Sequence, residues 1–193
     1  KACEPRENWK PSPLDQAICY HGMGHLFTFI TNADLPRALE VCDVVGQSPT
    51  GNFMRVCREG VFMQIYQPLE PDDFELVAQL PIKPTKENYR QFCSEYSMVS
   101  EEQGACLREA WPMFRQGLLD GTEAARFCSR QPNAEEEDNC YQSVSSIIGR
   151  MSLGSTEKAD KACSALPERR QVMCYSFSAQ SILEEDLADS ARA

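Results

Sequence analysis

The spacing of apolar side chains predicts amphipathic helices along most of the chain. From Cys140 onward, apolar residues recur at the i, i+4, i+7, i+8, i+11 spacing of a helix with one buried face, at Cys140, Val144, Ile147, Ile148 and Met151. The segment from Cys106 repeats this spacing at Ala110, Met113, Phe114 and Gly117. In both segments a cysteine lies on the apolar stripe, so we expect these cysteines to be buried within helices.

The cysteines indicate disulfide bonds rather than a zinc site. There are ten in 193 residues, an even number, and no CxxC or CxxH motif is present. This usage is typical of a protein that folds in an oxidising compartment. The ten fall into five couples along the sequence, and we predict one bridge within each couple: Cys3–Cys19, Cys42–Cys57, Cys93–Cys106, Cys128–Cys140 and Cys163–Cys174.

The couples also define an internal repeat. The first cysteines at 93, 128 and 163 are 35 residues apart, and the second cysteines at 106, 140 and 174 are 34 residues apart. A period near 35 residues is typical of two-helix repeats. Each unit then has a short first helix, which begins near an N-cap residue, and a longer second helix that carries the second cysteine. The N-cap candidates are Asp34, Thr85, Thr122 and Thr156.

The fold class predicted from this repeat is all-α, an α-solenoid-like array of about five disulfide-stapled helical hairpins with an irregular first hairpin. Residues 1–67 hold the first two hairpins and residues 85–193 the three regular ones, within one continuous domain. The interval between them, residues 68–84, contains four prolines, which exclude a continuous helix. We expect it to be an ordered, partly packed loop. The alternative is a linker between a two-hairpin and a three-hairpin unit.

The layout of this array resembles the cysteine-rich Sel1-like and tetratricopeptide class of α-hairpin repeats. The resemblance lies in the period, the helix pairs and the single disulfide of each hairpin, over about residues 34 to 185. It does not extend to sequence motifs, so it assigns no functional residue. It implies only that the array binds a partner, as such repeats generally do.

Charge and composition limit the classes of partner and the compartment that we expect for this protein. The net charge of −10 would repel both nucleic acid and anionic lipid, and no apolar run has the length of a membrane span. The chain begins at Lys1, so we expect a signal peptide or an upstream domain to have been removed. Together with the cysteines, this favours a secreted or periplasmic protein. The acidic run 135–138 is expected to open a helix.

The candidate chemistry lies in the two histidines, which are the only ones in the chain. His21 and His25 are spaced i, i+4, so they share one helix face and can bind one metal ion together. They stand two and six residues after Cys19, and Glu59 and Met63 occupy the same places after Cys57. Stacked repeats bring equivalent helices side by side, which predicts a site of two histidines and a carboxylate. The glutamate of an HExxH protease motif is absent.

The leading hypothesis is therefore an exported metal-binding helical-repeat protein whose site is His21, His25 and Glu59, with Met63 as a further ligand. Zinc or copper would suit it, and iron is a third option; whether the site is catalytic is open. Met23, Gln64, Tyr66, Asp72 and Asp73 are additional candidates. A second interpretation is that the histidine pair binds a non-metal ligand or acts as an acid–base site. The alternative function is a non-enzymatic protein-interaction module with structural histidines. The expected partner is a protein or a small-molecule ligand.

Overall fold

The computed structural model describes residues 2–190, and between 181 and 190 the only side chain it describes is that of Leu183. Helices make up most of the described chain, and its strands are limited to one pair of two residues each. The predicted all-α class is confirmed. The chain divides into two compact units, and the boundary in the sequence falls between Pro112 and Met113.

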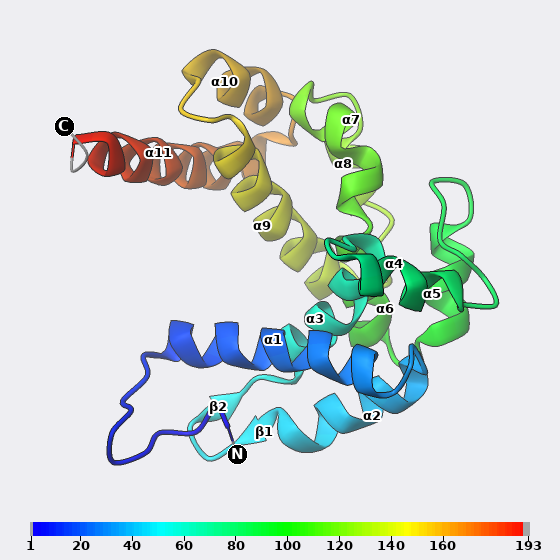
Figure 1. Ribbon diagram of the computed structural model, residues 1–193. Coiled ribbons are helices and arrows are strands. Elements are labelled where there is room, and N and C mark those ends of the chain that lie inside the picture. The colour runs from blue at the N-terminus through cyan, green and yellow to red at the C-terminus, as the bar shows by residue number, and fades with distance from the viewer. Residues whose placement is uncertain (1, 191–193) are drawn as a thin grey trace. The chain divides into compact units, whose positions relative to one another are not determined.

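The first unit is organised around the pair α1 and α3. Helix α1 packs along α3, α2 packs against both, and α4 and α6 pack against α3 (Figure 1). The strands β1 and β2 form a small antiparallel hairpin between α2 and α3, with Gln47 opposite Asn52. The elements are α1 (Pro13–Ile30), α2 (Leu35–Val45), β1 (Gln47–Ser48), β2 (Gly51–Asn52), α3 (Met54–Tyr66), α4 (Pro71–Ala78), α5 (Tyr89–Tyr96) and α6 (Ser100–Glu109).

The second unit is organised around the pair α9 and α11. These two helices pack along one another, and α10 packs against both as well as against α7. Glu135, Glu136 and Glu137 of the acidic run lie in the first turn of α9, where carboxylates complement the positive end of the helix dipole. The elements are α7 (Arg115–Leu119), α8 (Ala124–Cys128), α9 (Ala134–Met151), α10 (Thr156–Ser164) and α11 (Glu168–Ser190), and the 3-10 helix η1 (Trp111–Phe114) spans the boundary between the units.

All ten cysteines lie within the described residues, and they pair sequentially as the spacing predicts: Cys3–Cys19, Cys42–Cys57, Cys93–Cys106, Cys128–Cys140 and Cys163–Cys174. Four of the bridges join the two helices of a hairpin. The first is irregular, because Cys3 lies in a non-helical segment before α1. Disulfides of this kind form in an oxidising compartment. Within the described residues, no helix has the length and apolar character of a membrane span. The solenoid-like stacking of the hairpins stays a prediction.

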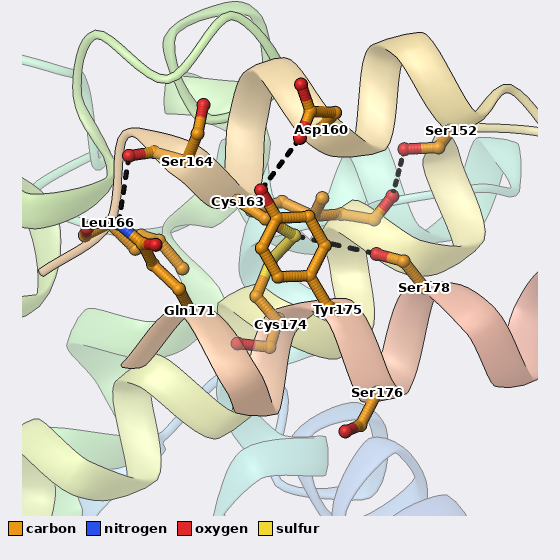
Figure 2. The surroundings of a disulfide bond; sticks show 12 residues. Ser152, Asp160, Cys163, Ser164, Leu166, Gln171, Cys174, Tyr175, Ser176 and Ser178 are labelled. Atoms are coloured by element: carbon orange, nitrogen blue, oxygen red, sulfur yellow. Dashed lines mark hydrogen bonds between the residues drawn. A yellow bond between two sulfur atoms is a disulfide. The ribbon is translucent and has the colours of Figure 1, made fainter. Parts of the chain in front are cut away.

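The last hairpin shows how hydrogen bonds support a bridge (Figure 2). Beside Cys163–Cys174, the hydroxyl of Tyr175 donates to Asp160 on the opposite helix at 2.8 Å. At the turn between α10 and α11, the side-chain amide of Gln171 donates to the backbone carbonyls of residues 164 and 166. The bridge and these hydrogen bonds tie the two helices together at both ends of the contact.

Among the predicted helix starts, one coincides with an observed N-cap. Asp34 caps α2, where its carboxylate accepts a hydrogen bond from the backbone N–H of Arg37. The other three threonines lie one to three residues away from the N-caps that the structure shows, because a neighbouring residue takes the half-helical position. Those N-caps are Asn88 for α5, Glu123 for α8 and Ser155 for α10.

The helix predicted from Cys106 to Gly117 is interrupted. Cys106, Ala110, Phe114 and Gly117 are buried as expected and Met113 is half-buried, but α6 ends at Glu109 and a 3-10 turn precedes α7. The reason is Pro112, which lacks a backbone N–H and whose ring clashes with the carbonyl four residues earlier. The spacing of the apolar residues alone does not reveal this break in the helix.

The proline-rich segment 68–84 holds the short helix α4, which begins with Pro71 at its first position, where a proline is well tolerated. Leu76 and Leu80 are buried, whereas Phe74 is exposed. Helix α4 packs against α3. The segment therefore brings Asp73 next to the second half of α3, where Gln64 donates a hydrogen bond to it.

Candidate functional site

Helices α1 and α3 cross at two glycines, and this crossing sets the orientation of both histidines. A Cβ atom added at Gly24 would lie 2.8 Å from the backbone nitrogen of Val61 and nearer still to the carbonyl oxygen of Cys57. A Cβ added at Gly60 would meet the carbonyl oxygen of His21 just as closely. The two backbones are therefore in direct contact. One turn further on, the buried Thr28 hydroxyl lies within hydrogen-bond distance of the carbonyls of Gly24 and Val61.

The histidines consequently face α3 rather than open solvent. His21 and His25 are both half-buried, and their ring centroids lie 5.0 Å apart in an edge-to-face arrangement. The Nε2 atom of His21 lies 3.1 Å from the sulfur of Met63, and the Nδ1 atom of His25 lies 2.7 Å from Oε1 of Gln64. The glycine crossing turns this side of α1 towards its neighbour.

A hydrogen-bonded chain links His25 to the proline-rich segment. The side-chain amide of Gln64 donates from Nε2 to Asp73, which leaves its Oε1 atom as an acceptor. His25 therefore donates from Nδ1. The other carboxylate oxygen of Asp73 accepts from the backbone N–H groups of Leu69 and Glu70 at 3.0 Å each, at the start of α4. Three helices thus fix one imidazole.

Burial and charge shift two groups of this cluster. Burial lowers the pKa of His21 below its ordinary value of 6.5, and the adjacent His25 lowers it further, against the opposing effects of Glu59 and of a hydrogen bond with the backbone of Val56. Burial raises the pKa of Asp73, but the hydrogen bonds from Glu70, Leu69 and Gln64 and the charge of His25 outweigh it, so this pKa lies below 3.8. His21 is therefore held neutral and Asp73 ionised near pH 7.

The metal-binding function predicted from the sequence is contradicted. Within the described residues, no three His, Cys, Asp or Glu side chains lie close enough together to hold a metal ion. The predicted carboxylate, Glu59, is engaged by two arginines: its Oε1 atom lies 3.1 Å from Nη1 of Arg55 and 2.8 Å from Nη2 of Arg108. The guanidinium of Arg108 is buried, and a buried cation needs this charge partner. Of the four predicted ligands, His21, His25 and Met63 come together, and Glu59 pairs elsewhere.

The exposed side of α1 carries a feature that the sequence reasoning missed. An apolar stripe runs along it, and its large side chains are about half to two-thirds exposed: Leu14 68 %, Ile18 62 %, Leu26 50 %, Phe29 47 % and Ile30 65 %. At its centre lies Gly22, where an added Cβ would have no atom within 4 Å. The signal in the sequence is the uncharged run between Asp15 and Asp34, which makes α1 apolar all round. Such helices are normally covered on every side.

The shifted pKa of His21 predicts a pH dependence of stability. Because the folded pKa lies below 6.5, the unfolded chain binds a proton first, so this residue makes the free energy of unfolding fall as the pH drops from about 7.5 through 6.5. The loss stops below the folded pKa. We expect His21→Leu to lose less stability than the wild type between about pH 7.5 and 5.5. Urea unfolding at both pH values measures this, with Gly22→Ala as a control that should follow the wild type. Equal losses in wild type and His21→Leu would contradict the assignment.

Comparisons of the chain with protein-family models, with curated proteins and with solved structures find no match. The function is therefore inferred from the two faces of α1 and the elements that hold them.

Proposed function

We propose that this chain is an exported binding protein that docks a helical segment of a protein partner on the outer face of α1. The observation that carries the proposal is the apolar stripe formed by Leu14, Ile18, Leu26, Phe29 and Ile30, which remains exposed although α1 already packs on α3 and α2. Contiguous exposed apolar surface of this kind typically marks an interaction site.

The chemistry of the stripe indicates what it binds. No charged residue occurs between Asp15 and Asp34, so a strongly charged partner surface would find no counter-charge there. The complement is an uncharged apolar face with the same spacing. An amphipathic helix offers one, with anchors that repeat every three or four residues. Gly22 leaves room for one such anchor at the centre of the stripe.

The cap, the disulfide and the helix packing that hold α1 in place favour binding, because a face that is already ordered loses less entropy when a partner docks. The helix is capped by Ser12, whose hydroxyl and backbone form a capping box with Asp15. The disulfide Cys3–Cys19 and the glycine crossing with α3 hold its middle. His25, fixed through Gln64, lies beside the stripe and can add one polar contact that orients the partner.

The compartment and the resemblance support the same role. The five disulfides favour an exported protein, secreted or periplasmic. Repeats of the Sel1-like and tetratricopeptide class, which the hairpin layout resembles, bind partners.

A defined peptide tests the docking. The probe is a fluorescent synthetic helix of about five turns with leucine and isoleucine at i, i+4 spacing and uncharged polar residues elsewhere. We expect fluorescence anisotropy to give a dissociation constant in the micromolar range, and Ile18→Glu to weaken binding at least tenfold, roughly 1.4 kcal/mol. Val44→Glu adds the same charge at an exposed valine on α2 and should bind like the wild type. Absence of binding at millimolar peptide, or equal binding by Ile18→Glu, would refute the proposal.

A further inference from the structure

One of the five disulfides differs from the others in its exposure to solvent. Cys19 is half-buried, whereas the nine other cysteines are 0 % exposed. All ten lie within the described residues, so the comparison covers every bridge. A thiolate that opens a disulfide has to reach one of its sulfur atoms, and burial protects a sulfur from this attack. Cys3–Cys19 is therefore the most accessible bridge of the folded chain.

This bridge also holds a different kind of structure. Each of the other four bridges joins two helices. Cys3–Cys19 instead ties α1 to the non-helical segment 2–11, which lies before α1 in the chain and which we call the strap (Figure 1). Cys3 is the only buried residue of the strap. The bridge can therefore open when the strap moves, without the separation of a packed pair of helices.

Side chains of α1 hold the strap beside the bridge and enclose Cys3. The amide of Gln16 donates from Nε2 to the backbone carbonyl of Cys3 at 3.1 Å, and the hydroxyl of Tyr20 donates to Oε1 of Glu4 at 2.7 Å. The sulfur of Met23 lies 3.5 Å from Sγ of Cys3. Cys19 is the half of the bridge that keeps exposed surface, so it is the half that an incoming thiolate meets.

From this exposure and this placement we infer that Cys3–Cys19 is a thiol–disulfide exchange site, which takes a small thiolate on Cys19 and releases the strap from α1. A small thiol suits the site because Cys19 is only partly exposed.

The exchange proceeds in two steps. The thiolate forms a new S–S bond with Sγ of Cys19, the bond between Cys3 and Cys19 breaks, and its electron pair leaves with Sγ of Cys3, which takes up a proton from water. A second thiolate then attacks the sulfur of the bound small thiol and displaces Cys19, which is protonated in turn. Two small thiols are thereby oxidised to one disulfide, and the bridge is reduced to two thiols.

The contacts that position α1 do not pass through the strap. The helix packs along α3 through the close approach of Gly24 and Gly60, and the bridge Cys42–Cys57 continues to join α2 to α3. The capping box of Ser12 and Asp15 also stays in place at the start of α1. We therefore expect the product of the exchange to be a folded chain with two thiols.

Exchange with glutathione, followed by alkylation, tests the inference. The fully oxidised chain is incubated with reduced glutathione at about pH 8, near the ordinary pKa of a thiol, and free thiols are trapped with N-ethylmaleimide. Peptide mass spectrometry then locates both groups. We expect glutathione on Cys19 and the alkyl label on Cys3, at least about tenfold faster than at any other bridge, while circular dichroism keeps its helical signal.

The matched control is Cys42–Cys57, which lies in the same unit and joins cysteines 15 residues apart, against 16 for Cys3–Cys19, but is fully buried. Urea below the unfolding transition should accelerate the opening of Cys42–Cys57, because its sulfurs become accessible only when structure opens. It should change the opening rate of Cys3–Cys19 by less than about twofold. Equal rates at the two bridges, glutathione first found on Cys3, or loss of helix together with the opening of Cys3–Cys19 would overturn the inference.

A chain with Cys3→Ser and Cys19→Ser provides the last check. It should remain helical and take up no glutathione in the time in which the wild type reacts. Uptake at the wild-type rate would place the exchange at another bridge and overturn the assignment.

Discussion

Gly24→Ala is expected to destabilise the first unit by about 3 kcal/mol, the upper part of the range for overpacked cores. The new methyl group would overlap the carbonyl oxygen of Cys57 and lie 2.8 Å from the backbone nitrogen of Val61. Both are backbone atoms, so no side chain can move aside to make room. Helices α1 and α3 have to separate, which also pulls His21 and His25 away from Met63 and Gln64.

The matched control is Gly22→Ala, two residues away on the same helix. An added Cβ at Gly22 has no atom within 4 Å, so the substitution only improves helix propensity and should stabilise the protein by about 1 kcal/mol. Urea unfolding followed by circular dichroism compares the two variants with the wild type. If both glycines respond alike, the close crossing of α1 and α3 is wrong.

Reduction of the disulfides is expected to unfold the chain completely. Each bridge joins cysteines 11 to 16 residues apart, for which the loss of loop-closure entropy predicts about 3 kcal/mol of stabilisation. Five such contributions match or exceed the whole stability of a typical domain, about 5 to 15 kcal/mol. Far-ultraviolet circular dichroism of the chain reduced and alkylated at pH 7 should therefore show little helix.

Removal of a single disulfide measures the contribution of one bridge to stability. Cys42→Ala combined with Cys57→Ala should lower the free energy of unfolding of the first unit by about 3 kcal/mol, because this bridge joins α2 to α3. Removing Cys163–Cys174 in the second unit by the same double substitution is the control and should leave the first unit's transition unchanged. A helical, cooperatively melting reduced chain would show that packing alone suffices.

The sequence was enough for the scaffold because its signals are local. A disulfide with a loop of 11 to 16 residues and a helix with an apolar stripe both lie within one hairpin, so spacing alone predicted them. The interruption at Pro112 shows the limit of this reasoning. Most of the stripe from Cys106 to Gly117 is buried as predicted, yet its backbone is not one helix.

The site was harder to predict because its contacts join residues far apart in the chain. Arg108, which forms an ion pair with Glu59, is 49 residues away from it in the chain. No residue near Glu59 in the sequence indicates this partner. The rotation of α1 depends on where Gly24 meets Gly60, 36 positions later. Gln64 and Asp73 were named as additional candidate ligands, but the structure places them in a hydrogen-bonded chain with His25, which depends on α4 packing on α3.

The nearest-neighbour order of the five bridges bears on how the protein matures. When the second cysteine of a couple emerges during synthesis, its partner is the nearest preceding cysteine, as Cys42 is for Cys57. Where each bridge closes before the next couple emerges, no wrong pair can form. A simple oxidant would be enough, without an isomerase to rearrange wrong pairs. The chain can acquire its covalent framework in the order in which it is made.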